Sequence, residues 1–252
     1  MSAILPPDRR GVGPTAGSRV SKGLLPALAR FSDGTGGVGM ADASKTNGIV
    51  AEFLELSSPI ISDAMDALGI HGTVDGLAPQ VPGKKMCGPA FTVRYTLAGE
   101  ALGRFADFMD DVPAGAVVAI DNDGRTGMSV WGDTLSSFAA RHGFAGTVID
   151  GVCRDIDGTR ALGYPMFSRG TFMRTGKGRV GIESTQQPVR IGPVLVHPGD
   201  LVFGDDTGVV VVPKDRVGEV LDHARRIAAR DDAWAAAIAA GKTMKDVWST
   251  RV

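Results

Sequence analysis

Two adjacent side chains in this sequence could bind an anion and a metal ion. Arg154 and Asp155 follow an apolar run at residues 146–150 that is typical of a buried strand. A guanidinium binds carboxylates and phosphates well, and an aspartate can hold a hard divalent cation. In open α/β sheets, ligands bind beyond the carboxyl ends of the strands. The pair therefore indicates an anion site beside a carboxylate suited to a cation.

A predicted helix start provides a second anion-binding element. The helix is expected at residues 132–141 and begins at Gly132-Asp133-Thr134-Leu135. The first N–H groups of a helix have no partner within it, and its dipole places partial positive charge there. We expect an anion to be held between this helix start and Arg154.

Several of these residues also have a structural interpretation. An Arg-Asp pair in a loop is often a surface ion pair, and Asp157 before Gly158 is typical of a helix N-cap. Asp121 and Asp123 are typical turn residues. The residue types alone leave these alternatives open.

The segments that must position these residues alternate between strands and helices. Buried strands are expected at residues 116–120, 146–150 and 165–168, with helices at 132–141 and 159–162. This alternation favours an α/β fold with a parallel core.

The flanking segments add helices before this core and a β-rich layer after it. A helical region at residues 46–68, interrupted at Ser57-Ser58-Pro59, precedes a strand at 90–96. A short helix at 105–109 and a turn at 121–124 are also expected. Short strands are then expected at 189–191, 194–196, 201–203 and 209–212. A long helix follows Pro213, and a helical stretch at 234–240 could pack against a neighbouring subunit.

Composition excludes several classes of protein. The 252 residues are 43% hydrophobic and 22% charged with a formal net charge of −1, so we expect neither nucleic-acid nor membrane binding. Cys87 and Cys153 are the two cysteines, which favours a reducing cytoplasm over a disulfide framework. No His or Cys pair has zinc-ligand spacing. Gly176-Lys177-Gly178 lacks the P-loop pattern.

The first part of the chain differs from the rest. Residues 1–44 are rich in Gly, Pro and Arg, so we expect a disordered N-terminal extension. Residues 45–252 are expected to form one folded domain.

At this point a family resemblance becomes visible. Asp133, twenty intervening residues and then Arg154-Asp155 match the D-x20-R-D signature of the 4-hydroxy-4-methyl-2-oxoglutarate (HMG/CHA) aldolases. The resemblance covers about residues 46–230. It extends to other segments of the chain, among them 61–69, 88–93, 147–151, 198–200 and 204–213.

The resemblance implies a specific fold, chemistry and site. The family consists of class II pyruvate aldolases on a swivelling β/β/α (RraA-like) fold with Mg²⁺ or Mn²⁺ as cofactor. It implies that Asp155 is the metal ligand, that Arg154 contacts the pyruvate unit and that Asp133 orients a water. The backbone of Gly132, Asp133, Thr134 and Leu135 would cradle the substrate carboxylate. Oxaloacetate decarboxylation is expected as a side activity, because it forms the same enolate.

The same fold also carries a rival function and leaves the substrate open. A regulator of ribonuclease E shares it, but that branch lacks the metal aspartate, so Asp155 favours the enzyme. Arg125, Arg174 and Arg179 are candidates to bind a distal carboxylate of the 2-oxo acid substrate. A homotrimer or hexamer in the cytoplasm is expected from the resemblance.

Overall fold

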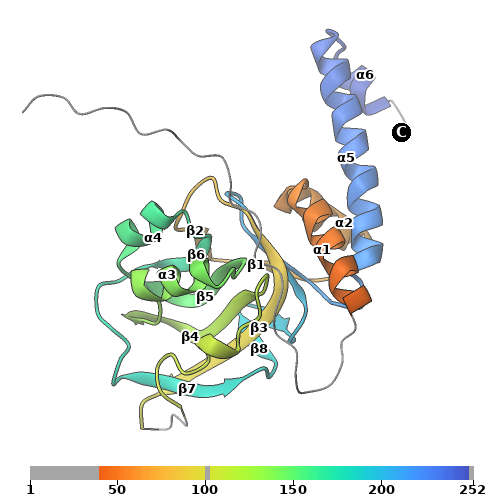
Figure 1. The fold of residues 1–252 in the computed structure, drawn as a ribbon. Coiled ribbons are helices and arrows are strands. Elements are labelled where there is room, and N and C mark those ends of the chain that lie inside the picture. The colour runs from red at the N-terminus through yellow and green to blue at the C-terminus, as the bar shows by residue number, and fades with distance from the viewer. Residues whose placement is uncertain (1–39, 100–102, 250–252) are drawn as a thin grey trace, which may run out of the picture. The chain divides into compact units, whose positions relative to one another are not determined.

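The structure is a computed structural model that describes residues 40–99 and 103–249 (Figure 1). Within these residues, nine strands form one mixed sheet. Its centre is four neighbouring parallel strands, which are β3 (Met86–Leu97), β4 (Val117–Ser129), β5 (Gly146–Cys153) and β6 (Met166–Thr171). The predicted α/β fold with a parallel core is confirmed.

Antiparallel strands extend this centre on both sides. Beyond β3 the order is β10, β11 and β1, β2 pairs with β6, and β7 pairs with the second half of β3. The bounds are β1 (Thr73–Val74), β2 (Ala78–Pro79), β7 (Val180–Thr185), β10 (Leu201–Gly204) and β11 (Val209–Val212). A separate hairpin, β8 (Val189–Ile191) and β9 (Val194–Val196), completes the predicted β-rich layer.

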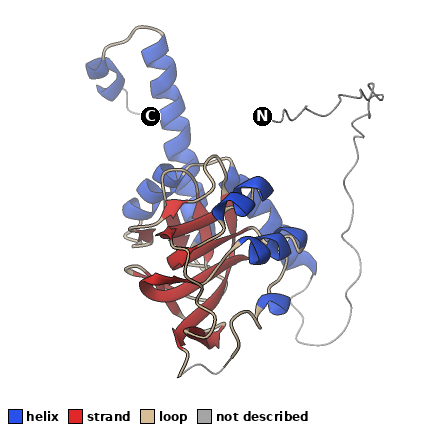
Figure 2. Ribbon diagram, turned by 90° about the vertical axis from the view of Figure 1, so that its left-hand side faces the viewer, coloured by secondary structure: helices blue, strands red, loops and turns tan. Residues whose placement is uncertain are grey.

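Three apolar clusters hold the layers together. One lies between the parallel strands and the helices α3 (Asp133–Arg141) and α4 (Ile156–Leu162). Another joins the opposite face of these strands to the β8–β9 hairpin and to β10 and β11. The third packs α1 (Met40–Leu54), α2 (Ser58–Ala67) and α5 (Val217–Ala239) on β10 and β11. The strands thus lie between α3 and α4 on one side and α1, α2 and α5 on the other (Figure 1), and Figure 2 shows the same helices and strands after a turn of 90°.

Four features differ from the sequence predictions. The helix expected at 105–109 is wrong, because the chain forms turns there and then a 3-10 turn at Met109–Asp111. β4 continues through the turn expected at 121–124, which appears as a register shift with positive φ at Asp123. The stretch at 234–240 is the end of α5 and not a separate helix. β1, β2, β7 and α6 (Met244–Ser249) were not predicted.

The predicted N-terminal extension falls largely outside the described residues. α1 begins at Met40, so residues 40–44 are helical. Residues 1–39 lie outside the part of the chain that the structure describes. None of the helices in that part is both long enough and apolar enough to cross a membrane.

Asp205, in the turn between β10 and β11, caps the start of α2. Its carboxylate accepts hydrogen bonds from the Ser58 N–H (2.8 Å) and the Ser58 hydroxyl (2.7 Å). The N–H groups of Thr207 (2.9 Å) and Gly208 (3.3 Å) donate to it as well. Burial raises the pKa of Asp205, but these four hydrogen bonds outweigh it and hold the pKa below its usual value.

We expect Asp205→Ala to lower the free energy of unfolding by about 2–3 kcal/mol, because buried donors lose a charged acceptor. A carboxyl with a lowered folded-state pKa stabilises the protein above its unfolded pKa of about 4, and this stabilisation disappears as the pH falls through the folded-state pKa. Urea unfolding at several pH values measures both effects. Exposed Asp206, which accepts one hydrogen bond from Gly83, is the control, and an equal loss in Asp206→Ala would contradict the capping role.

Candidate active site

The carboxyl ends of β4 and β5 bring the two predicted anion-binding elements together. The Arg154 N–H donates to the Trp131 carbonyl at 2.9 Å, and the Val130 N–H donates to Val152 at 3.2 Å. These bonds join the segment that follows β4 to the end of β5, so the start of α3 lies beside Arg154. The convergence expected from the sequence is confirmed.

A buried hydrogen-bond network fixes the two helix starts against each other. Ser136 and Thr159 have no exposed surface. The Ser136 hydroxyl donates to the Gly132 carbonyl at 3.0 Å and accepts from Trp131 Nε1 at 2.9 Å. The Thr159 hydroxyl in α4 lies 3.0 Å from the same oxygen, so it can donate there. This network makes the N-terminus of α3 a rigid wall of the site.

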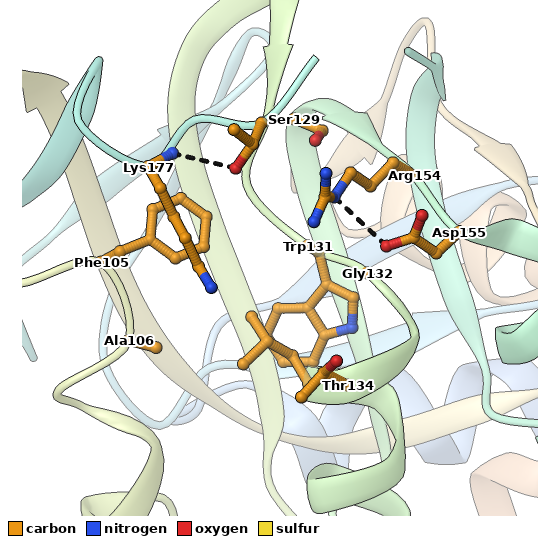
Figure 3. A pocket seen from close by; sticks show the side chains of 11 residues that line it. Phe105, Ala106, Ser129, Trp131, Gly132, Thr134, Arg154, Asp155 and Lys177 are labelled. Atoms are coloured by element: carbon orange, nitrogen blue, oxygen red, sulfur yellow. Dashed lines mark hydrogen bonds and ion pairs between the residues drawn. The ribbon is translucent and has the colours of Figure 1, made fainter. Parts of the chain in front are cut away.

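A cavity of about 100 Å³ lies between these elements (Figure 3). One water needs about 10–15 Å³ of such space, so the cavity has room for a small acid group. No side chain caps α3 at Gly132, so the first N–H groups of the helix remain available for an anion. The cavity is lined by Phe105, Ala106, Ser129, Trp131, Gly132, Thr134, Leu135, Arg154, Asp155, Thr175 and Lys177.

Arg154 and Asp155 form an ion pair at the edge of this cavity. Arg154 Nε lies 3.2 Å from Asp155 Oδ2, and the two side chains are 36% and 43% exposed. Asp155 has a left-handed backbone (φ 52°) and precedes α4, which turns its carboxylate toward Gly132. A Cβ at position 132 would lie 2.8 Å from Asp155 Oδ2, so glycine there leaves room for the carboxylate.

The Asp133 side chain does not face the cavity as its neighbours at the start of α3 do. It does not line the cavity. A Cβ at Gly158 would lie 2.7 Å from Asp133 Cβ, so Asp133 packs against the start of α4. Its Oδ1 accepts a hydrogen bond from the Thr134 hydroxyl at 3.3 Å. The role of Asp133 in orienting a water stays a prediction.

The donor set beside the cavity fits one kind of metal ion. Asp155 is the one carboxylate among the lining residues, and the described residues contain no group of three or more His, Cys, Asp or Glu that could hold a metal ion. This set does not fit zinc, which takes three or four protein ligands. It fits Mg²⁺ or Mn²⁺, because Mg²⁺ keeps several waters and binds through one or two carboxylates plus substrate oxygens.

Cys153 has no nucleophilic role in this arrangement, although it precedes Arg154. Its side chain is fully buried and lies 3.6 Å from the Ser168 hydroxyl. Burial raises the pKa of the Cys153 thiol, and the hydrogen bonds and the charge of Arg160 offset this only in part. Burial also raises the pKa of Cys87, to about 12. Both thiols therefore stay protonated at neutral pH.

Sequence reasoning missed part of the cavity wall. None of Arg125, Arg174 and Arg179 lines it: Arg125 pairs with Asp123 at 3.1 Å, Arg174 lies over the Phe172 ring, and Arg179 donates to the Thr175 carbonyl. Lys177 lines it instead, from the loop between β6 and β7. Neither Phe105 nor Thr175 carries a sequence signal that marks it as part of a site.

Comparison with known proteins places this geometry in a family. Residues 58–211 match the model of the RraA-like family, described as Aldolase/RraA. The chain belongs to this family. It is 34% identical over 184 residues to a protein of Halalkalibacterium halodurans provisionally named 4-hydroxy-4-methyl-2-oxoglutarate aldolase, covering 73% of this chain and 85% of that protein. The aldolase resemblance is thereby confirmed at the level of the family.

A longer relative and two solved structures agree with this assignment. Protein DlpA of Legionella pneumophila is 38% identical over 200 residues, which are 78% of this chain but only 32% of DlpA. An uncharacterized Pseudomonas syringae protein has a TM-score of 0.75 at 39% identity, over 80% of this chain and 96% of that one. RraAS2 of Streptomyces coelicolor, described as an unusual member of the RNase ES inhibitor RraA family, has a TM-score of 0.69 at 30% identity, over 73% and 95%.

Proposed function

We propose that this RraA-like protein is a metal-dependent carbon-carbon lyase that cleaves a 4-hydroxy-2-oxo acid. Its substrate would resemble 4-hydroxy-4-methyl-2-oxoglutarate, and its products would be pyruvate and a second 2-oxo acid. The observation that carries the proposal is the convergence of Arg154, Asp155 and the uncapped start of α3 on one small cavity. Relatives provisionally named as aldolases support it.

The proposed reaction is a retro-aldol cleavage. The bond between C3 and C4 of the substrate breaks, and its electron pair moves toward C2 to give a pyruvate enolate. The C4 hydroxyl loses its proton and becomes the carbonyl of the second 2-oxo acid. The enolate then takes a proton at C3 to form pyruvate. The catalyst must therefore stabilise negative charge on the C2 oxygen and move one proton.

The protein supplies fixed positive charge for this step. The N–H groups at the start of α3 would bind the C1 carboxylate, as helix N-termini bind anions. The Arg154 guanidinium would lie at the C2 oxygen and stabilise the charge that develops there. The Arg154 backbone N–H is bound to the Trp131 carbonyl, and Asp155 pairs with the guanidinium, so the side chain is oriented before the substrate binds.

Asp155 would hold Mg²⁺ or Mn²⁺ through its carboxylate. When bound, the ion supplies a Lewis acid for the enolate charge. Asp133, at the first turn of α3, would orient a water for proton transfer. Oxaloacetate decarboxylation would need the same residues, because loss of CO₂ from oxaloacetate leaves the same pyruvate enolate.

The alternative is a regulator of ribonuclease E, because the similar protein RraAS2 belongs to a family described as RNase ES inhibitors. Asp155 favours the enzyme, because a protein that acts only by binding a partner has no need of a carboxylate beside a small anion site. The cytoplasmic location and the homotrimeric or hexameric assembly stay predictions.

The test is pyruvate release by the purified protein, coupled to lactate dehydrogenase. We expect turnover of 4-hydroxy-4-methyl-2-oxoglutarate and of oxaloacetate with Mg²⁺ or Mn²⁺, and a fall of at least about 100-fold after treatment with EDTA, since a bound Lewis acid contributes several kcal/mol. Restoring Mg²⁺ should restore the rate. Absence of metal-dependent pyruvate from both substrates would contradict the proposal, and binding to a ribonuclease partner would then be measured.

A further inference from the structure

The helices α3 and α4 contact each other at their N-terminal ends, and Figure 1 shows them side by side. A Cβ at Gly132 would lie 2.8 Å from Asp155 Oδ2. A Cβ at Gly158 would lie 2.7 Å from Asp133 Cβ. As the side chains stand, neither position has room for a Cβ atom, so glycine permits this close approach. The start of α3 therefore lies directly beside the aspartate that precedes α4.

Thr159 attaches α4 to α3. It is the one buried residue of α4 and has no exposed surface. Its hydroxyl lies 3.0 Å from the Ser136 hydroxyl. Because Ser136 donates its single hydroxyl hydrogen to the Gly132 carbonyl, Thr159 is the donor in the bond between the two hydroxyls. The Thr159 N–H in turn donates to the Asp155 carbonyl at 3.3 Å, so a shift of Thr159 would move Asp155 with it.

The position of α4 depends strongly on this one buried bond. Asp157, Ala161 and Leu162 are exposed, so much of the helix has little contact with the core. The start of α3 carries partial positive charge for a substrate carboxylate, whereas Asp155 carries the negative charge for a cation. An anion and a cation bound at neighbouring points attract each other, and the attraction weakens as their separation grows. The bond at Thr159 thus fixes the separation of two oppositely charged ligands.

We propose that Thr159 is a positioning residue that couples the metal site to the carboxylate site. Its hydroxyl holds Asp155 at a fixed distance from the start of α3, so each ligand favours the binding of the other. By linkage the effect is reciprocal: the carboxylate strengthens metal binding as much as the metal strengthens carboxylate binding. This inference rests on the proposed function and adds a metal-dependent affinity for the substrate to it.

Pyruvate binding with and without Mg²⁺ measures the coupling in the absence of turnover. We expect wild-type protein to bind pyruvate about 10-fold more tightly at saturating Mg²⁺, within the usual range for coupled sites. Thr159→Val keeps the shape of the side chain and removes the hydroxyl. This variant should reduce the factor to less than about 3 and leave the affinity without metal unchanged. Thr159→Ser should restore the factor, and isothermal titration calorimetry measures all three proteins.

Thr147→Val is the matched control. Thr147 in β5 is also fully buried, and its hydroxyl also pairs with one other hydroxyl, that of Tyr164 at 2.8 Å. Its bond joins neither helix start, so this variant should keep the wild-type coupling. Equal weakening of pyruvate binding with and without Mg²⁺ in Thr159→Val would indicate a merely structural role and overturn the inference. Absence of coupling in wild type, an unchanged factor in Thr159→Val or an equal loss in Thr147→Val would overturn it as well.

Turnover separates this inference from the lyase proposal. With oxaloacetate and saturating Mg²⁺, we expect Thr159→Val to lower kcat by about 10–100-fold, as for a small misplacement of a reacting group, and Thr159→Ser to recover it. Coupling that depends on Thr159 in a protein that releases no pyruvate would support the role of Thr159 and refute the lyase. Metal-dependent pyruvate release with coupling that ignores Thr159 would support the lyase and refute the role of Thr159.

Discussion

Replacing Arg154 by lysine is expected to lower kcat by about 100–1,000-fold with a smaller change in KM, the usual cost of removing one fixed donor to a developing oxyanion. Lysine keeps the charge but loses the planar fork that can reach Asp155 and the substrate oxygen together. The backbone N–H bond to Trp131 remains in the variant, but Asp155 Oδ2 lies 3.2 Å from Arg154 Nε, a nitrogen that lysine lacks. Steady-state kinetics with oxaloacetate measures the effect.

Arg125→Lys is a matched control for this variant. Arg125 also follows a strand register shift and also pairs with a nearby aspartate, Asp123, but it does not line the cavity. Its variant should keep wild-type kinetics. A rise in KM with unchanged kcat for Arg154→Lys would contradict the proposed role, because it would indicate that Arg154 binds substrate and transition state equally.

The sequence could predict the parallel core and the centre of the site for a common physical reason. The apolar run before Arg154 predicts β5, and the apolar stripe after Gly132 predicts α3. Parallel neighbours place their carboxyl ends at one edge of the sheet, so residues that follow two such strands must meet. The meeting of Gly132 and Arg154 therefore depends on local patterns that a single sequence contains.

The rest of the site depends on contacts that local patterns do not contain. Lys177 lies between two glycines in a loop, where a lysine is usually a solvated charge. It reaches the cavity because Gly176 pairs with Ser129, a contact between residues 47 positions apart. Phe105 had a helical pattern, yet its segment forms turns that place the ring against the cavity. Tertiary contacts decided the structure at these positions.

Asp155→Asn is expected to abolish the stimulation of pyruvate release by Mg²⁺ and to lower kcat/KM by about 1,000-fold, because loss of a bound Lewis acid removes several kcal/mol of stabilisation. Asparagine is a demanding test because it keeps the size of the side chain and tolerates the left-handed backbone at this position (φ 52°). The fold and the start of α4 should therefore persist, with thermal unfolding close to wild type. Pyruvate release at several Mg²⁺ concentrations measures the effect.

Asp123→Asn is the control that makes the same substitution at an aspartate outside the cavity. Asp123 has the same left-handed backbone (φ 54°) and pairs with Arg125 at 3.1 Å, as Asp155 pairs with Arg154 at 3.2 Å. The two acids differ in that only Asp155 lines the cavity. If Asp155→Asn alone loses the metal dependence, the carboxylate acts through the site. If both variants lose activity equally, the left-handed Asp–Arg pairs act through the fold, and the metal would have to bind elsewhere.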